Sequence, residues 1–206
     1  MSYILKIVVP PLPAEDALAW RAADTICDND DDAAPKAPVL VRLHDVLTSV
    51  YPCLCSDAAE APDMDDTPWS DGPLINNFGS ASAVLGLATD DDDGSAVAFI
   101  VAASRTLGLT VLDGQVRKIH RPQVPQPGQT YAVCVQGVAN GYREATVKIA
   151  AGRVFGATPE QVGTIFATPG CRIKRGADYL TALRYQAMLR RLGCRSTIEV
   201  EQPPAA

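Results

Sequence analysis

The spacing of apolar and polar positions predicts alternating strands and helices along the first 120 residues. Short runs of apolar or β-branched residues between turn signals indicate strands, and apolar residues recurring every three or four positions indicate helices. The predicted strands span 3–9, 81–88, 109–112 and 116–120, and the predicted helices span 13–26, 39–51 and 95–107. This set is typical of an α+β unit with a mixed or antiparallel sheet. We expect its helices to pack on one face of that sheet.

The rest of the chain has a clearer pattern, in the order β-α-α-β-α-β. The predicted strands span 130–138, 171–174 and 197–200, and the predicted helices span 142–155, 158–168 and 179–192. In the first helix, apolar residues recur at Ala145, Ile149, Ala150 and Val154. Thr158 is expected to cap the second helix, and Asp178 the third. Gly193 follows as the C-terminal cap.

A proline-rich stretch divides these two parts. Residues 121–129 contain three prolines and a glycine, which favours an extended connector over a helix or a central strand. The sequence therefore predicts an acidic α+β domain over 1–121, a linker over 122–129, a basic domain over 130–201 and a tail over 202–206.

The composition is that of an ordinary globular protein. Of its 206 residues, 47% are hydrophobic and 20% are charged, which argues against a disordered acidic tail. No apolar stretch is long enough for a membrane span, and the first residues do not resemble a secretory signal, so we expect a cytoplasmic protein without a membrane partner. Six cysteines in such a protein are expected to be reduced thiols. Cys53 and Cys55 are the one close pair, without the further ligands of a zinc site, so no cofactor is predicted.

The net charge of −6 conceals a division between the two parts. Residues 1–122 contain 8 basic and 19 acidic residues, a balance of 8 − 19 = −11. Residues 123–206 contain 10 basic and 5 acidic residues, a balance of 10 − 5 = +5. Such an asymmetry concerns partners rather than the fold. The two parts are expected to attract each other, and the acidic part is expected to face a basic partner.

No pattern of catalytic residues emerges from the sequence. His44 and His120 are the two histidines, and His44 adjoins Asp45 on a predicted helix, where adjacent residues do not face each other. The nucleophile, zinc-protease and phosphate-loop motifs are missing. We therefore predict that the protein is not an enzyme. An enzyme with an unrecognised active site is kept as an alternative, after the two binding functions described below.

The candidate binding residues lie in acidic loops of the first part. They share a negative charge or an aromatic ring beside such charges: Asp63, Asp65, Asp66, Trp69, Asp71, Phe78, Asp90, Asp91, Asp92 and Asp93. The carboxylates form either solvated loops or a negative surface for a basic partner. Trp69 and Phe78 either anchor that contact or, as an alternative for Trp69, fill the core from a loop.

Two stretches of this part carry a resemblance. The sequence Pro-Trp-Ser-Asp-Gly-Pro-Leu at 68–74 and Gly-Leu-Thr-Val-Leu-Asp at 108–113 resemble those of small bacterial proteins that accompany secreted toxins, including toxins of type VI secretion. Leu112 stands where that group often has a tyrosine. The resemblance implies an immunity protein, which binds a cognate toxin and neutralises it by steric occlusion.

The basic part resembles another family. The element order and several residues are similar to the C-terminal domain of the bacterial ribosomal stalk protein: Gly156, Ala157, Thr158, Pro169, Lys174, Ala182, Leu189, Gly193, Ile198, Glu199 and Val200. That family docks partner proteins through a basic helical face, although Gly152 and Phe155 stand here where basic residues are expected. The resemblance implies a compact docking domain, and hence an adaptor as the second functional hypothesis.

Binding of nucleic acid is not predicted for the basic part. Its arginines and lysines would suit phosphate contacts: Arg172, Lys174, Arg175, Arg184, Arg190, Arg191 and Arg195. An interleaved aromatic platform is missing, however, because Tyr179 and Tyr185 are the sole candidates. A solvated helix face, or attraction to the acidic part, explains these residues better.

Overall fold

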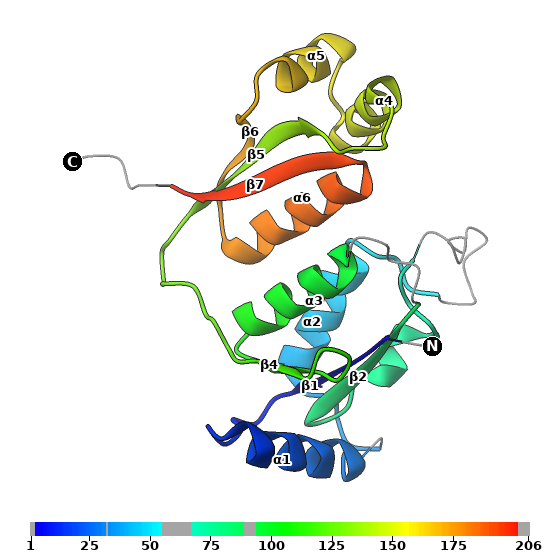
Figure 1. Cartoon of the computed structure of the whole chain (residues 1–206), viewed down its shortest axis with the longest axis vertical. Helices are drawn as coiled ribbons and strands as arrows, with labels where there is room; N and C mark the ends of the chain where they lie inside the picture. The colour runs from blue at the N-terminus through cyan, green and yellow to red at the C-terminus, as the bar shows by residue number, and fades with distance from the viewer. Residues whose placement is uncertain (1–2, 32, 55–66, 89–93, 202–206) are drawn as a thin grey trace. The chain divides into compact units, whose positions relative to one another are not determined.

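The computed structural model describes residues 3–31, 33–54, 67–88 and 94–201. The chain divides into two compact units, unit 1 (residues 1–124) and unit 2 (residues 125–206) (Figure 1). Each unit has its own antiparallel sheet with helices, so the fold is α+β, as the sequence predicts. No helix in these ranges is long and apolar enough to cross a membrane.

Unit 1 is built on a four-stranded antiparallel sheet in the order β2-β1-β3-β4. Its strands are β1 (Tyr3–Val8), β2 (Ser82–Leu87), β3 (Thr110–Asp113) and β4 (Lys118–His120). Its helices are α1 (Asp16–Asp28), α2 (Pro38–Thr48), the short 3-10 helix η2 (Leu74–Asn77) and α3 (Ser95–Thr106). Apart from η2, each corresponds to an element that the sequence predicts.

Local backbone geometry shifts the ends of some elements from their predicted positions. The first helix starts at Asp16 rather than residue 13, because Glu15 before it is extended (φ −71°, ψ 124°). The fourth strand starts late because Asp113 Oδ1 accepts hydrogen bonds from the backbone N–H groups of Gln115 (3.1 Å) and Val116 (3.3 Å). These bonds turn the chain before it can pair again.

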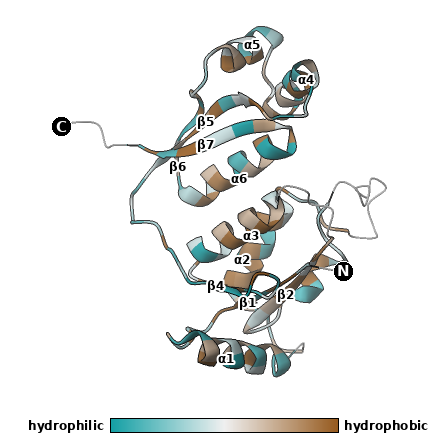
Figure 2. Cartoon of the chain, in the orientation of Figure 1, coloured by the Kyte–Doolittle hydropathy of each residue, from teal (hydrophilic) through white to brown (hydrophobic). Residues whose placement is uncertain are grey.

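Different helices cover the two faces of the unit 1 sheet. Val8 and Leu112 form a buried cluster with Ala23 of α1. Neighbouring residues of a strand point to opposite faces, so Ile7 and Val111 point away from α1, toward the side where α2 and α3 lie (Figure 1). Hydrophobic residues run along α2 and α3, whereas α1 alternates between hydrophobic and hydrophilic (Figure 2). The prediction that all helices lie on one face is therefore wrong, because both faces of β1 and β3 carry apolar side chains.

Unit 2 has the predicted β-α-α-β-α-β order. Its elements are β5 (Tyr131–Val138), α4 (Glu144–Phe155), α5 (Pro159–Ala167), β6 (Cys171–Ala177), α6 (Tyr179–Arg191) and β7 (Cys194–Val200). The antiparallel sheet has the order β6-β5-β7, with β5 in the centre. Alternate residues of β5 pack with side chains from all three helices: Tyr131, Val133, Val135, Val147, Ile165, Phe166, Ala182 and Leu189.

The other face of the unit 2 sheet carries small residues in its centre. Ala132 and Cys134 of β5 are fully buried, and their cross-strand neighbours include Arg172 on β6 and Glu199 on β7. Arg172 Nη2 lies 3.3 Å from Glu199 Oε2, so this ion pair joins the two outer strands across β5.

The predicted helix caps of unit 2 are present. Thr158 and Gln161 form a reciprocal capping box: Gln161 N donates to Thr158 Oγ1 (3.3 Å), and Thr158 N donates to Gln161 Oε1 (2.8 Å). Asp178 Oδ1 accepts a hydrogen bond from the backbone N–H of Thr181 (2.8 Å). Gly193 has the positive φ (81°) expected after a helix.

The start of the predicted linker belongs to unit 1. Arg105 Nε of α3 donates a hydrogen bond to the carbonyl oxygen of Arg121 (2.8 Å), and the backbone N–H of Gln123 donates to the carbonyl oxygen of Arg105 (2.9 Å). The division between the units falls after Val124, inside the predicted linker over 122–129.

Candidate functional site

The two aromatic residues predicted to contact a partner lie in the core of unit 1. Trp69 is 2% exposed, and its Nε1 donates a hydrogen bond to the carbonyl oxygen of Tyr51 (3.1 Å). Phe78 is 1% exposed, and its ring forms a T-shaped pair with that of His44, with 5.5 Å between the ring centres. Neither ring is available to anchor a partner, which corrects that part of the predicted surface. The alternative, in which Trp69 fills the core from a loop, matches its position.

Of the predicted acidic residues, Asp71 alone falls in the described part of the chain. It is exposed, and its Oδ1 accepts a hydrogen bond from Nδ2 of Asn77 (3.0 Å). The other predicted carboxylates lie outside the described residues: Asp63, Asp65, Asp66, Asp90, Asp91, Asp92 and Asp93.

The described residues that flank the two acidic segments are joined to each other. The backbone N–H of Ala88 donates to the carbonyl oxygen of Pro68 (2.8 Å), and that of Ser70 donates to the carbonyl oxygen of Gly86 (3.0 Å). Trp69 pairs with Leu87 between these bonds. Segment 55–66 ends immediately before this short ladder, and segment 89–93 begins immediately after it. The two acidic segments therefore join the fold at the same end of β2.

A partly buried carboxylate holds the other end of β2. Asp30 Oδ1 accepts hydrogen bonds from the backbone N–H (2.9 Å) and Oγ (2.6 Å) of Ser80, and Asp30 Oδ2 accepts from the N–H (2.7 Å) and Oγ (2.7 Å) of Ser82. The N–H of Ala81 lies 3.2 Å from both oxygens. We call these contacts the Asp30 clamp. Asp30 is thus bound to the chain before β2, although it stands in a run of acidic residues typical of a solvated loop.

The electrostatics of the Asp30 clamp favour the ionised carboxylate. Burial acts to raise the pKa of Asp30, but the hydrogen bonds from Ser80, Ser82 and Ala81 outweigh it and lower the pKa to about 2. Lys36 assists by donating to the carbonyl oxygen of Phe78. Asp30, between α1 and α2, thus holds the chain that leads into β2, the strand whose other end pairs with residues 68–70.

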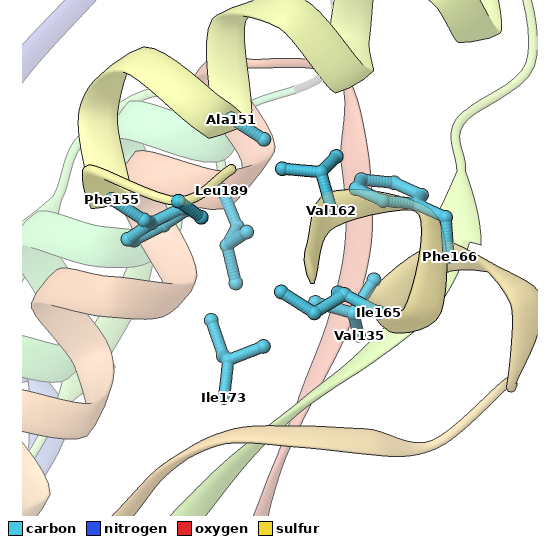
Figure 3. Close-up of a pocket in the computed structure, with 9 residues that line it drawn as sticks. Val135, Ala151, Phe155, Val162, Ile165, Phe166, Ile173 and Leu189 are labelled. Atoms are coloured by element: carbon cyan, nitrogen blue, oxygen red, sulfur yellow. The ribbon is translucent and has the colours of Figure 1, made fainter. Parts of the chain in front are cut away.

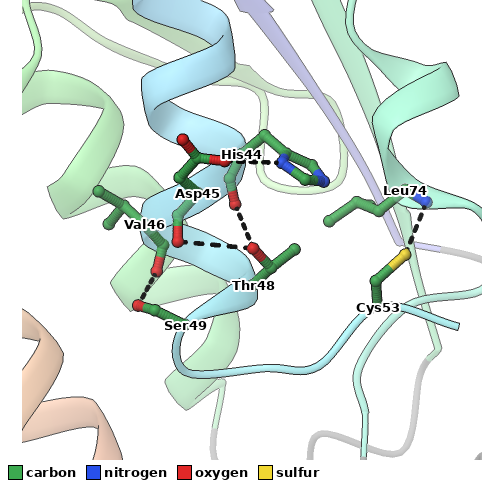
Figure 4. A network of polar contacts seen from close by, with 7 residues as sticks. All are labelled: His44, Asp45, Val46, Thr48, Ser49, Cys53 and Leu74. Carbon is green, nitrogen blue, oxygen red and sulfur yellow. Dashed lines mark hydrogen bonds and ion pairs between the residues drawn. The ribbon is translucent and has the colours of Figure 1, made fainter. Parts of the chain in front are cut away.

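The histidines are placed as structural residues. His44 Nδ1 lies 3.3 Å from Asp45 Oδ1, so the tips of these adjacent side chains do meet, against expectation (Figure 4). The hydroxyl of Thr48 donates to the carbonyl oxygen of His44 (2.9 Å). His120 lies on β4, where burial and the charge of Lys118 lower its pKa against the opposing influence of Asp113. Neither histidine faces a nucleophile in the contacts that the structure shows.

Cys53 has a structural contact as well. Its Sγ accepts a hydrogen bond from the backbone N–H of Leu74 at 3.2 Å, at the start of η2 (Figure 4). Cys55 lies outside the described residues. Among the residues that are described, no three His, Cys, Asp or Glu side chains lie close enough together to hold a metal ion.

Unit 2 presents an open groove that the sequence analysis did not predict. The groove has a volume of about 530 Å³ and lies along α4 and the start of α5. Ile149 is 59% exposed in it, between the basic residues Lys148 and Arg153. Lys148 is partly engaged, because its Nζ lies 2.6 Å from Glu144 Oε1 and 5.8 Å from the ring centre of Phe166. An exposed apolar side chain flanked by cations is suited to a partner segment of complementary character.

A glycine brings the two sides of the groove together. A Cβ at Gly152 would lie 3.3 Å from the carbonyl oxygen of Ala157 and 3.4 Å from Cγ2 of Val162. The absence of a side chain therefore lets α5 begin close against α4. Phe155 is turned inward and stacks on Tyr185 (6.1 Å, 9°). Gly152 and Phe155 thus both serve packing in unit 2.

A second, much smaller cavity shares Val162 with the groove. It is lined by apolar side chains of the sheet and the three helices, among them Val135, Phe155, Val162, Ile173 and Leu189 (Figure 3). Its free volume is about 10 Å³, room for one water molecule at most, and apolar cavities of this size stay dry. It is a packing gap of the unit 2 core and offers no ligand site.

Comparison with known proteins gives no relative. No protein-family model, no curated protein and no solved structure matches the chain. Its function must therefore be inferred from the charge and geometry of the two units.

Proposed function

We propose that this protein binds another protein and neutralises it by covering the surface that the partner needs for its activity. The observation that carries the proposal is the ladder between Pro68 and Ala88, because it brings the ends of two acidic segments together. Segments 55–66 and 89–93 contain nine acidic residues and no basic one. The described residues that adjoin these two segments lie beside each other at one end of β2.

Such a concentration of charge suits a basic partner. Complementary charge accelerates association and disfavours neutral or acidic competitors. A toxin that degrades nucleic acid has a positive substrate groove, which carboxylates can occupy in place of phosphates. This chemistry agrees with the resemblance of residues 68–74 and 108–113 to bacterial immunity proteins. The proposed partner is therefore a cognate toxin with a basic surface, met in the cytoplasm without a cofactor.

Co-expression with the protein encoded beside this one tests the proposal. We expect the neighbour to be toxic alone and harmless together with this chain. The triple variant D90N/D91N/D92N should slow complex formation about tenfold at low salt, because steering depends on local charge. The control E15Q/D28N/D45N removes the same number of charges from exposed positions elsewhere in unit 1. A harmless neighbour, or equal effects of the two variants, would contradict the proposal.

A second candidate function is that of an adaptor that docks a partner through the α4–α5 groove. The observation in its favour is the exposure of Ile149 within an open hollow of about 530 Å³. I149D would place a charge in the groove, whereas V154D changes an exposed residue of the same helix outside the lining. If I149D abolishes binding of the same neighbour and the acidic triple variant does not, the adaptor function replaces neutralisation through unit 1.

A further inference from the structure

The outer edge of the unit 2 sheet is formed by β7, which has a strand on one side only. Its other neighbour within the described chain is missing, because the sheet order is β6-β5-β7. The backbone N–H of Glu201 donates to the carbonyl oxygen of Thr130 (2.9 Å), continuing the pairing of β7 with β5. Backbone groups alternate in direction along an antiparallel strand, so Thr197 and Glu199 also bond to β5. The backbone groups of Ser196, Ile198 and Val200 therefore point outward.

This edge lacks most of the devices that prevent strands from pairing with other chains. It spans seven residues, contains no proline and ends in Val200, which is 57% exposed. Within the described part of the chain, Gln186 Nε2 donates a hydrogen bond to one of its outward groups, the carbonyl oxygen of Ser196 (3.1 Å). A carbonyl oxygen has two lone pairs, so this bond does not exclude a second donor.

The charged side chains of β7 are placed so that two antiparallel copies of the strand would bring opposite charges together. Arg195 and Glu199 are both exposed and lie two residues to either side of Thr197, on the same face of the sheet. If a second copy of β7 pairs antiparallel about a two-fold axis at Thr197, each Arg195 lies opposite the Glu199 of the second copy. Two copies of this edge would thus attract each other. Many other exposed edge strands carry like charges, which repel a second copy.

We propose that the protein forms a symmetric dimer in which two β7 strands pair and join the unit 2 sheets of both copies. In this register the outward backbone groups of Ser196 meet those of Ile198 in the second copy. The pairs at Thr197 and at Arg195–Glu199 are then non-hydrogen-bonded pairs, whose side chains approach most closely. The register aligns residues 194–200 in full and covers the exposed Val200. A shift of the axis to Glu199 would oppose like charges, and a shift to Ile198 would shorten the overlap.

Charge reversal tests both the dimer and its register in the full chain. Sedimentation should show a dimer for the wild type, and R195E should weaken it about tenfold or more, because it puts like charges opposite one another twice. E199R should weaken it as well, and it also removes the ion pair of Glu199 with Arg172 within the chain. When the two variants are mixed, the introduced glutamate of one faces the introduced arginine of the other, so a heterodimer should form. R184E, a reversal on the exposed side of α6, is the control and should dimerise like the wild type.

A disulfide tests the position of the axis. Residues at the centre of a non-hydrogen-bonded pair lie about 4.5 Å apart between Cα atoms, which suits a disulfide. Under mild oxidation T197C should cross-link into dimers, while R195C should not, and the wild type controls for the native cysteines. A monomeric wild type, a mixture of variants that stays monomeric, or equal cross-linking at both positions would overturn the proposal.

Discussion

Replacement of Asp30 by asparagine tests the carboxylate of the Asp30 clamp, which accepts hydrogen bonds from three consecutive residues. The introduced amide keeps one acceptor oxygen but presents an N–H₂ group to a loop in which Ser80, Ala81 and Ser82 all offer donors. The pKa of Asp30 is lowered from 3.8 to about 2, and a tenfold change in an acid dissociation constant corresponds to about 1.4 kcal/mol. The carboxylate is partly open to solvent, which screens it, so we expect D30N to lower the free energy of unfolding by about 1–2 kcal/mol at pH 7.

The dependence on pH identifies the carboxylate as the cause. A carboxyl group whose pKa is lowered on folding stabilises the protein above its ordinary pKa, and this contribution disappears as the pH falls through the folded value. The difference in stability between wild type and D30N should therefore be constant above pH 5 and shrink between pH 4 and 2.

Urea denaturation followed by tryptophan fluorescence measures this difference, because Trp20 and Trp69 both lie in unit 1 and report its unfolding alone. D28N removes a charge from an exposed residue nearby and should change the stability by less than about 0.5 kcal/mol. If D30N is as stable as the wild type at pH 7, or if the difference persists unchanged to pH 2, the reasoning about the Asp30 clamp is refuted.

Two further substitutions, one in each unit, test single contacts. G193A should destabilise unit 2 by about 1–3 kcal/mol in thermal unfolding followed by circular dichroism, because its Cβ would lie 2.3 Å from the Tyr142 ring at a φ of 81°. G141A, with a φ of 88° but open space, should show the smaller cost of strain alone. Y3F removes the hydrogen bond from Tyr3 Oη to the buried Asp113 (2.6 Å) and should cost about 1.5–3 kcal/mol in urea at pH 7. Burial and Asp113 raise the pKa of Tyr3 to about 12, so the wild-type advantage should be present below pH 10 and be lost as the pH approaches 12. Equal losses for both glycines, or an unchanged Y3F, would contradict these assignments.

Local signals in the sequence predict much of the fold. The hydroxyl of Thr158 and the amide of Gln161 are three residues apart, and their capping box needs no other part of the chain. Asp178 and Gly193 likewise act on residues beside them. The element order of both units follows from such signals together with apolar spacing.

Contacts between distant residues could not be predicted in this way. Asp30 and Ser80 are fifty positions apart, so an acidic run that resembles a solvated loop conceals a clamp. The apolar residues Ile149 and Val154 indicate a helix correctly but lie on its exposed side, whereas Val147 and Ala151 are buried. The signal for the groove was that helix α4 has apolar residues on two faces. A single sequence does not tell which of the two faces the rest of the fold will cover.

The order of strands in unit 1 has a consequence for synthesis of the chain. Strand β1 is made before both of its neighbours and lies between them in the sheet, where Leu5 pairs with Leu85 on one side and with Asp113 on the other. At about 5–20 residues per second, the ribosome needs several seconds to deliver the second of these neighbours. During that time an apolar segment with strand propensity has at least one unpaired edge. During synthesis of unit 1, strand β1 therefore presents an edge to which a chaperone can bind.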